Sequence, residues 1–279
     1  GGAARRAGAT RVIATTHGHE VGWGLWPGPR QALRRIFADA DVVTYISQYT
    51  LERLAPHIPP GTTTLRLPSG IDTDRFHPDP HARARLRRRY HIGDAPTVVC
   101  VSRLVARKGQ DALIAAWPRV VEAVPGARLV IVGWGPYARE LALMRRRCPV
   151  RDSIVLTGAV PGEELPGHVA LGDVFAMPCR TRNLGMDVEG LGIVFLEASA
   201  TGLPVVAGDS GGAPETVVEG QTGTVVDGRD PDALVDALVT QLRDADLRQR
   251  MGRAGRDLML RQWTWPSLVD SLVEAIDAR

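Results

Sequence analysis

The chain has 279 residues, a formal net charge of +3 and a pI near 9.0, with 44% hydrophobic and 23% charged residues. This length fits one large or two ordinary domains, and the composition is typical of a soluble globular protein. The positive balance suits an anionic small molecule or an anionic membrane surface and is too mild to indicate nucleic acid. No apolar run approaches the ~20 residues of a membrane span.

Three cysteines lie far apart in the sequence, at Cys100, Cys148 and Cys179. Their odd number and their spacing match neither a disulfide framework nor a zinc site. Free cysteines are usual in a reducing compartment, so we expect a cytoplasmic protein.

The first 78 residues alternate short apolar strands, expected at 11–17, 42–46 and 62–67, with a helix at 30–38. Between the first strand and that helix, a loop at 19–29 carries Trp23 and Trp26. A complete α/β domain takes about 100–150 residues. We therefore interpret residues 1–78 as the C-terminal part of a Rossmann-like domain whose front is missing.

From Thr97 onward the alternation of strand and helix becomes regular. Strands are expected at 97–102, 128–132, 154–157, 173–177, 204–207 and 224–226. Six short apolar strands alternating with helices predict an α/β class, with a parallel, doubly wound sheet covered by helices on both faces. We assign residues 79–262 to this complete domain and expect the C-terminal helix, 263–279, to pack back on the first domain.

A glycine-rich turn joins two glutamates within this domain. Glu189 precedes Gly190-Leu191-Gly192, and the predicted helix from Ile193 carries Glu197. Unpaired backbone N–H groups and the positive end of the helix dipole make such a turn an anion site. Carboxylates beside a phosphate repel it, but they accept hydrogen bonds from hydroxyl groups. An anion flanked by hydroxyls describes a sugar nucleotide.

Positive charge is expected at the same edge of the sheet. Arg103 and Lys108 follow the first strand of the regular domain, and the ligand crevice of an open α/β sheet lies at the carboxyl ends of its strands. Two cations there can hold a diphosphate and stabilise the charge that grows on it as it leaves. Taken singly, either Arg103 or Lys108 is equally well explained as a surface residue of an ordinary solvated loop.

Three other patterns carry weaker predictions. Gly133 opens a G-x-G-x-x-A match, but the match follows the second strand, and no acidic residue ends the next one. His17 ends a strand, and we favour a substrate contact if the two domains face each other. We expect no metal site, because the three Asp-x-Asp pairs lie in unrelated places and the cations make a metal unnecessary.

Taken together, these motifs resemble glycosyltransferase family four, the retaining, metal-independent transferases of the two-Rossmann-domain GT-B type. The resemblance rests on Arg103-x4-Lys108, on Glu189-x7-Glu197 followed by Ala198–Pro204, and on Ser210–Glu215. The stretches 16–23, 44–50 and 179–182 are similar to the actinobacterial GDP-mannose-dependent phosphatidylinositol mannosyltransferases. The nearest type acts on phosphatidylinositol monomannoside.

The resemblance implies a retaining transfer of a hexose, mannose from GDP-mannose, to a phosphatidylinositol mannoside lipid. It implies no cofactor besides the donor, and a protein on the cytoplasmic face of the membrane. Arg103, Lys108, Gly133 and the amides of Gly190, Leu191, Gly192 and Ile193 would bind the donor, Glu197 its ribose, and Glu189 and His17 the hexose.

Two alternatives stay open at this point. One is a nucleotide-sugar-binding remnant with weak catalysis, because part of the acceptor domain is missing. The other is an oxidoreductase that binds a dinucleotide at Gly133–Ala138.

Overall fold

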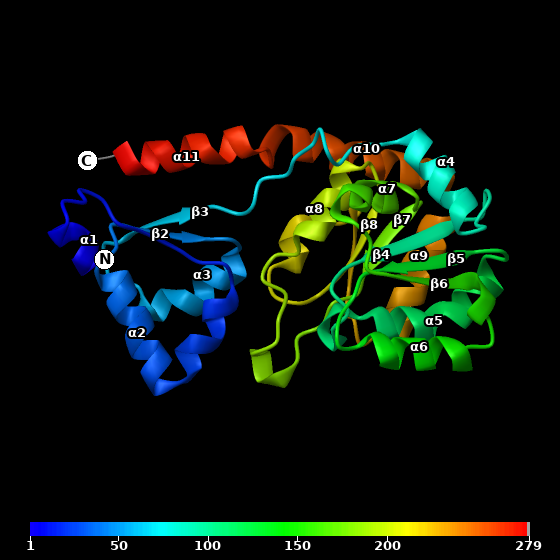
Figure 1. The fold of residues 1–279 in the computed structure, drawn as a ribbon, viewed down its shortest axis with the longest axis horizontal. Helices are drawn as coiled ribbons and strands as arrows, with labels where there is room; N and C mark the ends of the chain where they lie inside the picture. Colours follow the sequence, from blue (N-terminus) through cyan, green and yellow to red (C-terminus); the bar gives the residue numbers. More distant parts are fainter. Residues whose placement is uncertain (278–279) are drawn as a thin grey trace.

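Short apolar segments form two separate parallel sheets, each covered by helices, in two lobes that lie beside one another (Figure 1). The computed structural model describes residues 1–277. The first lobe holds α1 (Gly2–Arg6), β1 (Ile13–Thr15), the 3₁₀ helix η1 (His19–Leu25), α2 (Pro27–Ala38), β2 (Val42–Tyr45), α3 (Gln48–Leu54), η2 (Ala55–His57) and β3 (Thr63–Arg66). We call it the first domain. Its three strands pair in the order β1-β2-β3.

The second lobe, called here the second domain, is built on a six-stranded parallel sheet. Its strands are β4 (Thr97–Val101), β5 (Arg128–Val132), β6 (Ile154–Gly158), β7 (Val174–Met177), β8 (Val205–Gly208) and β9 (Gly223–Val226). Its α-helices are α4 (Pro80–Arg89), α5 (Gln110–Ala123), α6 (Ala138–Arg147), α7 (Leu165–Ala170), α8 (Ile193–Ala200), α9 (Pro231–Arg243) and α10 (Ala245–Gln262). Short 3₁₀ turns are η3 (Ala106–Lys108), η4 (Arg151–Ser153), η5 (Gly162–Glu164), η6 (Asn183–Gly185) and η7 (Ala213–Thr216).

The strand order β6-β5-β4-β7-β8-β9 is that of a dinucleotide-type doubly wound sheet. The chain starts at β4 in the middle, winds outward to β6, and then returns to β7 on the other side of β4. The predicted α/β class with a doubly wound sheet is therefore confirmed. In such a sheet, the point where the winding reverses, here between β4 and β7, is where ligands bind.

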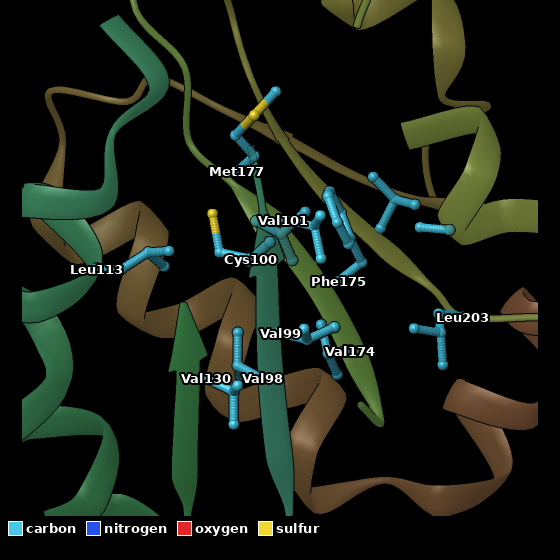
Figure 2. Close-up of a cluster of buried hydrophobic side chains, with 14 of the residues drawn as sticks. Val98, Val99, Cys100, Val101, Leu113, Val130, Val174, Phe175, Met177 and Leu203 are labelled. Carbon is cyan, nitrogen blue, oxygen red and sulfur yellow. The ribbon is translucent and has the colours of Figure 1, made fainter. Parts of the chain in front are cut away.

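The core of the second domain surrounds β4, which is buried at every position (Figure 2). Val98 and Val99 pack among apolar side chains of the neighbouring strands and helices, including Val130, Leu113 and Phe175 (Figure 2). Burial on both faces explains why β4 reads as a continuous apolar run in the sequence. It also fixes the position from which the loop after β4 leaves the sheet.

The first domain has a smaller core of its own, formed by Leu33, Phe37, Val43 and Leu54. Leu33 and Phe37 lie four residues apart on α2 and therefore face the same side of that helix. This pairing is why the predicted helix at 30–38 forms, and the structure extends it back to Pro27.

The chain crosses between the domains twice, once after β3 and once at its C-terminal end. The last described helix, α11 (Trp265–Asp277), contacts β3 of the first domain and runs along that domain in Figure 1. The backbone N–H of Ile71 donates to the carbonyl of Trp263 over 2.7 Å, which ties the two crossings together. Residues 278–279 of the expected segment 263–279 lie outside the described residues.

Two local expectations differ from the structure. The strand expected at 11–17 is only three residues long, so His17 lies in the following loop. The sequence predicts a helix over 213–219, but the structure has only a 3₁₀ turn, Ala213–Thr216, in which Pro214 supplies no backbone N–H. Among the helices of residues 1–277, none is both long and apolar enough to span a bilayer.

Candidate functional site

The loops after β4 and β7 leave neighbouring strands at the reversal point of the sheet and meet at one cleft. The first loop contributes Arg107 and Lys108, and the second contributes residues from Met186 to Glu189. Gly109 adopts a φ of +78°, and a Cβ there would overlap the carbonyl of Pro178. A glycine is therefore required at this position for the two loops to approach each other so closely.

Lys108 and Glu189 form a buried ion pair in the wall of the cleft. The Nζ of Lys108 lies 2.5 Å from the Oε2 of Glu189, and the two residues are only 8% and 6% exposed. Arg107 stands beside them, with its Nε 3.9 Å from the same carboxylate oxygen and an Nη 3.3 Å from Asp187. This Nε is buried and has no hydrogen-bond partner among residues 1–277. The pair therefore has an adjacent cation with donor capacity to spare.

The glycine-rich turn opens α8 as the sequence predicts. Gly192, the N-cap residue, has a φ of +86° and offers no side chain to cap the helix. The amides of Ile193 and Val194 are therefore left for another acceptor, whereas the amide of Phe195 donates to the Gly192 carbonyl. Gly190, Leu191, Gly192 and Ile193 all line the cleft. The positive end of the α8 dipole therefore points into the space beside Lys108.

A second glycine-rich turn, Ser210-Gly211-Gly212, supports the Glu189 loop from behind. The amide of Gly212 donates to the carbonyl of Glu189 over 3.0 Å, and the hydroxyl of Ser210 lies 3.3 Å from the Glu189 amide. A Cβ on Gly211 would overlap the Glu189 carbonyl. These contacts fix the backbone from which the Glu189 side chain projects.

The opposite wall of the cleft comes from the first domain and the C-terminal helix. It includes His17, Gly18, His19, Ile46 and Trp265. A Cβ on Gly18 would come within 3.2 Å of the Cα of Gly190, so the two domains touch at this point. The cleft has a volume of about 610 Å³, which is in the range of small-molecule sites. The structure thus brings His17, Lys108, Glu189 and the amides of 190–193 to one cleft between the domains.

Three residues predicted for the site do not line this cleft. Arg103 is exposed, on the same connection as Lys108. Glu197 lies on α8 one turn after Ile193, and therefore on the helix face that starts at the cleft. Burial raises the pKa of Glu197 to about 7, an effect that Arg75 partly offsets.

Gly133 has a role in packing that does not require a ligand. It follows β5 with a φ of +144°, and a Cβ there would overlap the carbonyl of Ser102 at the end of β4. The next carbonyl, of Trp134, accepts the amide of Leu104 over 3.1 Å. The turn that matches the dinucleotide pattern is thus held against the loop after β4, and this close approach explains why position 133 is a glycine.

Among the cleft residues that were not predicted from the sequence are Arg107 and Trp265. Arg107 adjoins Lys108, so the strand-to-helix connection that indicated Lys108 also held the signal for Arg107. Trp265 lies about 70 residues beyond the glycine-rich turn and belongs to α11. No local pattern indicates that this helix returns to the cleft, since its position depends on contacts between distant segments.

Comparison with known sequences decides the family. The profile described as "Glycosyl transferases group 1" matches residues 82–258, and the one described as "Glycosyltransferase Family 4" matches residues 1–75. The chain belongs to the group 1 glycosyltransferases. The predicted resemblance to glycosyltransferase family four is confirmed, and the protein is a glycosyltransferase.

Curated relatives of this glycosyltransferase share much of its sequence. It is 57% identical to a Mycobacterium tuberculosis GDP-mannose-dependent alpha-(1-6)-phosphatidylinositol monomannoside mannosyltransferase, over 97% of this chain and 70% of the relative. It is 47% identical to the monoacylated-substrate counterpart of Corynebacterium glutamicum, over 99% of this chain and 72% of the relative.

Solved structures show the same fold at low sequence identity. Anabaena HepE, in complex with UDP and glucose, aligns with a TM-score of 0.82 and 20% identity over 95% of this chain and 71% of its own. Sucrose-phosphate synthase from Thermosynechococcus elongatus aligns with a TM-score of 0.81 and 24% identity, over 99% of this chain and 69% of its own. These structures support the GT-B arrangement of two Rossmann-like domains.

Proposed function

We propose that this glycosyltransferase transfers mannose from GDP-mannose to a phosphatidylinositol monomannoside lipid, with retention of the anomeric configuration. The observation that carries the proposal is the position of the uncapped N-terminus of α8 beside the buried Lys108–Glu189 pair. An anion site and a carboxylate in one cleft match a diphosphate joined to a sugar. The named activities of the two mannosyltransferase relatives supply the donor and the acceptor.

In this proposal the donor's diphosphate lies against the amides of 190–193. Lys108 and Arg103 balance its charge, and Arg107 adds a third cation from the same connection. Charge-assisted hydrogen bonds of this kind are stronger than neutral ones, and a buried cation stabilises the negative charge that develops as the diphosphate departs. This arrangement needs no metal ion and no cofactor for the transfer step. Glu197 accepts hydrogen bonds from the ribose, one helical turn along α8.

The hexose lies between the domains, where Glu189 accepts hydrogen bonds from its hydroxyl groups and His17 contacts it from the opposite wall. Retention follows from a front-face reaction. The acceptor hydroxyl oxygen bonds to the anomeric carbon on the side from which the phosphate oxygen departs. The departing phosphate oxygen takes the acceptor's proton. One C–O bond to the acceptor forms, the C–O bond to the phosphate breaks, and GDP leaves. The residues named here orient the two substrates and exclude water.

The acceptor in this proposal carries acyl chains that stay in the bilayer, so its headgroup must enter the cleft at a membrane surface. We therefore place the protein on the cytoplasmic face of the membrane as a peripherally bound enzyme.

The test is a transfer assay with GDP-mannose and purified phosphatidylinositol monomannoside, in which the product is detected by mass spectrometry. We expect a mass gain of one hexose, with no metal added and a chelator present. UDP-glucose in place of GDP-mannose serves as the donor control. GDP binding without any product would support a nucleotide-sugar-binding role instead. Binding of NAD(H) in place of GDP would favour an oxidoreductase that uses a dinucleotide.

A further inference from the structure

Two exposed loops carry large apolar side chains on either side of the cleft. In the first domain, η1 and the residue after it present Trp23, Leu25 and Trp26, which are 44%, 58% and 60% exposed. In the second domain, the η6 loop presents Leu184 and Met186, which are 101% and 47% exposed. We call these five side chains the apolar rim.

Both loops are continuous with the cleft. η1 begins at His19, which lines the cleft, and Met186 lines it from the second domain. In Figure 1, the junction of η1 with α2 and the yellow-green segment around 183–186 both reach the lower edge of the view, one from each domain. The two loops that carry the apolar rim therefore both border the cleft, one from each domain.

The η6 loop holds its apolar tip in a disfavoured backbone conformation. Asn183 and Leu184 have φ values of +50° and +54°, in the left-handed region that residues with a side chain rarely adopt. Leu184 is nevertheless fully exposed, so no burial within residues 1–277 offsets this conformation. Strained residues of this kind concentrate at functional positions, which favours a binding role for the loop tip.

Exposed arginines lie beside the apolar rim in both domains, whereas the acidic neighbours Glu20 and Asp187 are only half-exposed. Residues 21–38 contain no aspartate or glutamate, and Arg30, Arg34 and Arg35 are exposed on α2 directly after Trp26. In the second domain, Arg182 is exposed two residues before Leu184. Tryptophan and arginine side by side fit the interface of a bilayer with anionic lipids, where the rings lie at headgroup level and the arginines meet phosphates.

We propose that the apolar rim docks the enzyme on an anionic lipid bilayer through both domains at once. The tryptophan loop inserts from the first domain and the Leu184 loop from the second, so that the cleft opens directly on the lipid surface. This inference rests on the proposed function, since it explains how a lipid headgroup reaches Glu189 without leaving the membrane.

Vesicle sedimentation tests the proposal with the full chain and vesicles of equal parts phosphatidylglycerol and phosphatidylcholine. The variants are the double change Trp23→Ser with Trp26→Ser, and the single change Leu184→Asp. Each should weaken vesicle binding roughly tenfold, because it removes buried apolar area or adds a charge at the interface. Matched controls are Trp134→Ser, on the β5–α6 turn, and Leu260→Asp on α10, since both residues are exposed but lie outside the rim.

GDP affinity and transfer to a deacylated, water-soluble acceptor separate this proposal from the proposed function. Both should stay at the wild-type level in the rim variants, because none of the changed residues lines the cleft. Wild-type vesicle binding in either rim variant would overturn docking through both domains, as would equal losses in the controls. Rim-dependent vesicle binding by a protein that makes no product would instead overturn the proposed function and leave the docking surface standing.

Discussion

The Nζ of Lys108 lies 2.5 Å from the Oε2 of Glu189, and both side chains are about nine-tenths buried. Two buried charges held this closely depend on each other, because removing one leaves the other buried without its partner. The same two groups serve different parts of the donor in the proposed function. Substitutions at this pair should therefore separate sugar recognition, diphosphate recognition and folding stability.

Glu189→Gln should reduce transfer far more than nucleotide affinity. The amide keeps the shape of the side chain but weakens its hydrogen bonds to the hexose hydroxyls, which GDP alone does not possess. We expect transfer to fall by about a hundredfold, in line with the loss of one well-placed polar group in an active site, and GDP affinity to change by less than about threefold. Steady-state rates and calorimetry measure the two effects. Glu163→Gln, at an exposed carboxylate of the second domain, is the control. Equal losses of rate and affinity would contradict a role in sugar contact.

Arg103→Ala and Lys108→Met should both weaken GDP binding, with different consequences for stability. Arg103 is exposed, so its removal should lower GDP affinity by roughly tenfold while the melting temperature stays constant. Lys108→Met leaves Glu189 buried without its closest cation and should also destabilise the fold, by about 3 kcal/mol or less, because Arg107 remains nearby. Calorimetry and thermal melting report the two effects. Arg146→Ala, at an exposed residue of α6, controls for general loss of charge. Unchanged GDP affinity in a variant that combines Arg103→Ala with Lys108→Met would refute the diphosphate assignment.

Local patterns were sufficient to predict the second domain and one wall of its site. β4 is a continuous apolar run, and Lys108 and the turn at Gly190–Gly192 follow strands, so periodicity and turn chemistry indicate both the strands and the cleft edge. The same rules placed Arg103 beside Lys108, yet the structure leaves Arg103 exposed while Lys108 is buried. Spacing along a chain gives the edge of the sheet but not the direction of each side chain.

The rest of the site depends on contacts between distant residues. His17 faces Gly190 only because the two domains close on each other, and Trp265 reaches the cleft only because α11 returns to β3. Neither contact can be predicted from a local stretch of sequence, because the residues that make it are far apart in the chain. The 3₁₀ turn η7, expected as a helix, shows the same limit, because its tertiary contacts and Pro214 together decide its length.

Glu197 should make the stability of the protein depend on pH. Its pKa is raised from the ordinary value of 4.5 to about 7, chiefly by burial. Between these two pH values the folded state binds more protons than the unfolded state, so stability falls as pH rises through this window and then levels off above pH 7. The whole effect is roughly 3 kcal/mol at most. Urea denaturation from pH 4 to pH 8 should show this fall in the wild type, and a flatter profile in Glu197→Gln.

The same residue should give GDP binding the opposite dependence on pH, because the proposed ribose contact needs the ionised carboxylate. GDP affinity of the wild type should rise as pH increases through about 7, and this rise should be absent in Glu197→Gln. Guanine does not titrate in this range, and the GDP phosphate contributes equally to both proteins, so their difference isolates Glu197. Parallel affinity profiles for the two proteins would remove Glu197 from the ribose site.

Glu215 should hold the two domains together when no donor is bound. It belongs to η7 of the second domain, and its carboxylate accepts the backbone amides of Gln48 and Tyr49, at the start of α3 in the first domain, over 2.9 and 3.1 Å. The neighbouring hydroxyl of Ser47 donates to the carbonyl of Gly190 over 2.8 Å. A carboxylate at a helix N-terminus also gains from the helix dipole. These contacts join α3 to the turns that shape the donor cleft.

Glu215→Gln should therefore loosen the domains while each domain stays folded. Loss of the charge weakens two hydrogen bonds in a partly exposed place, for a total of about 1 kcal/mol. We expect a larger radius of gyration by X-ray scattering and a KM for GDP-mannose that rises roughly fivefold, because closure brings His17 to the Glu189 wall. Glu219→Gln is the matched control, since that carboxylate accepts the amide of Val225 within the second domain alone. Scattering curves and KM values that coincide for Glu215→Gln and Glu219→Gln would show that the contact on α3 does not govern closure.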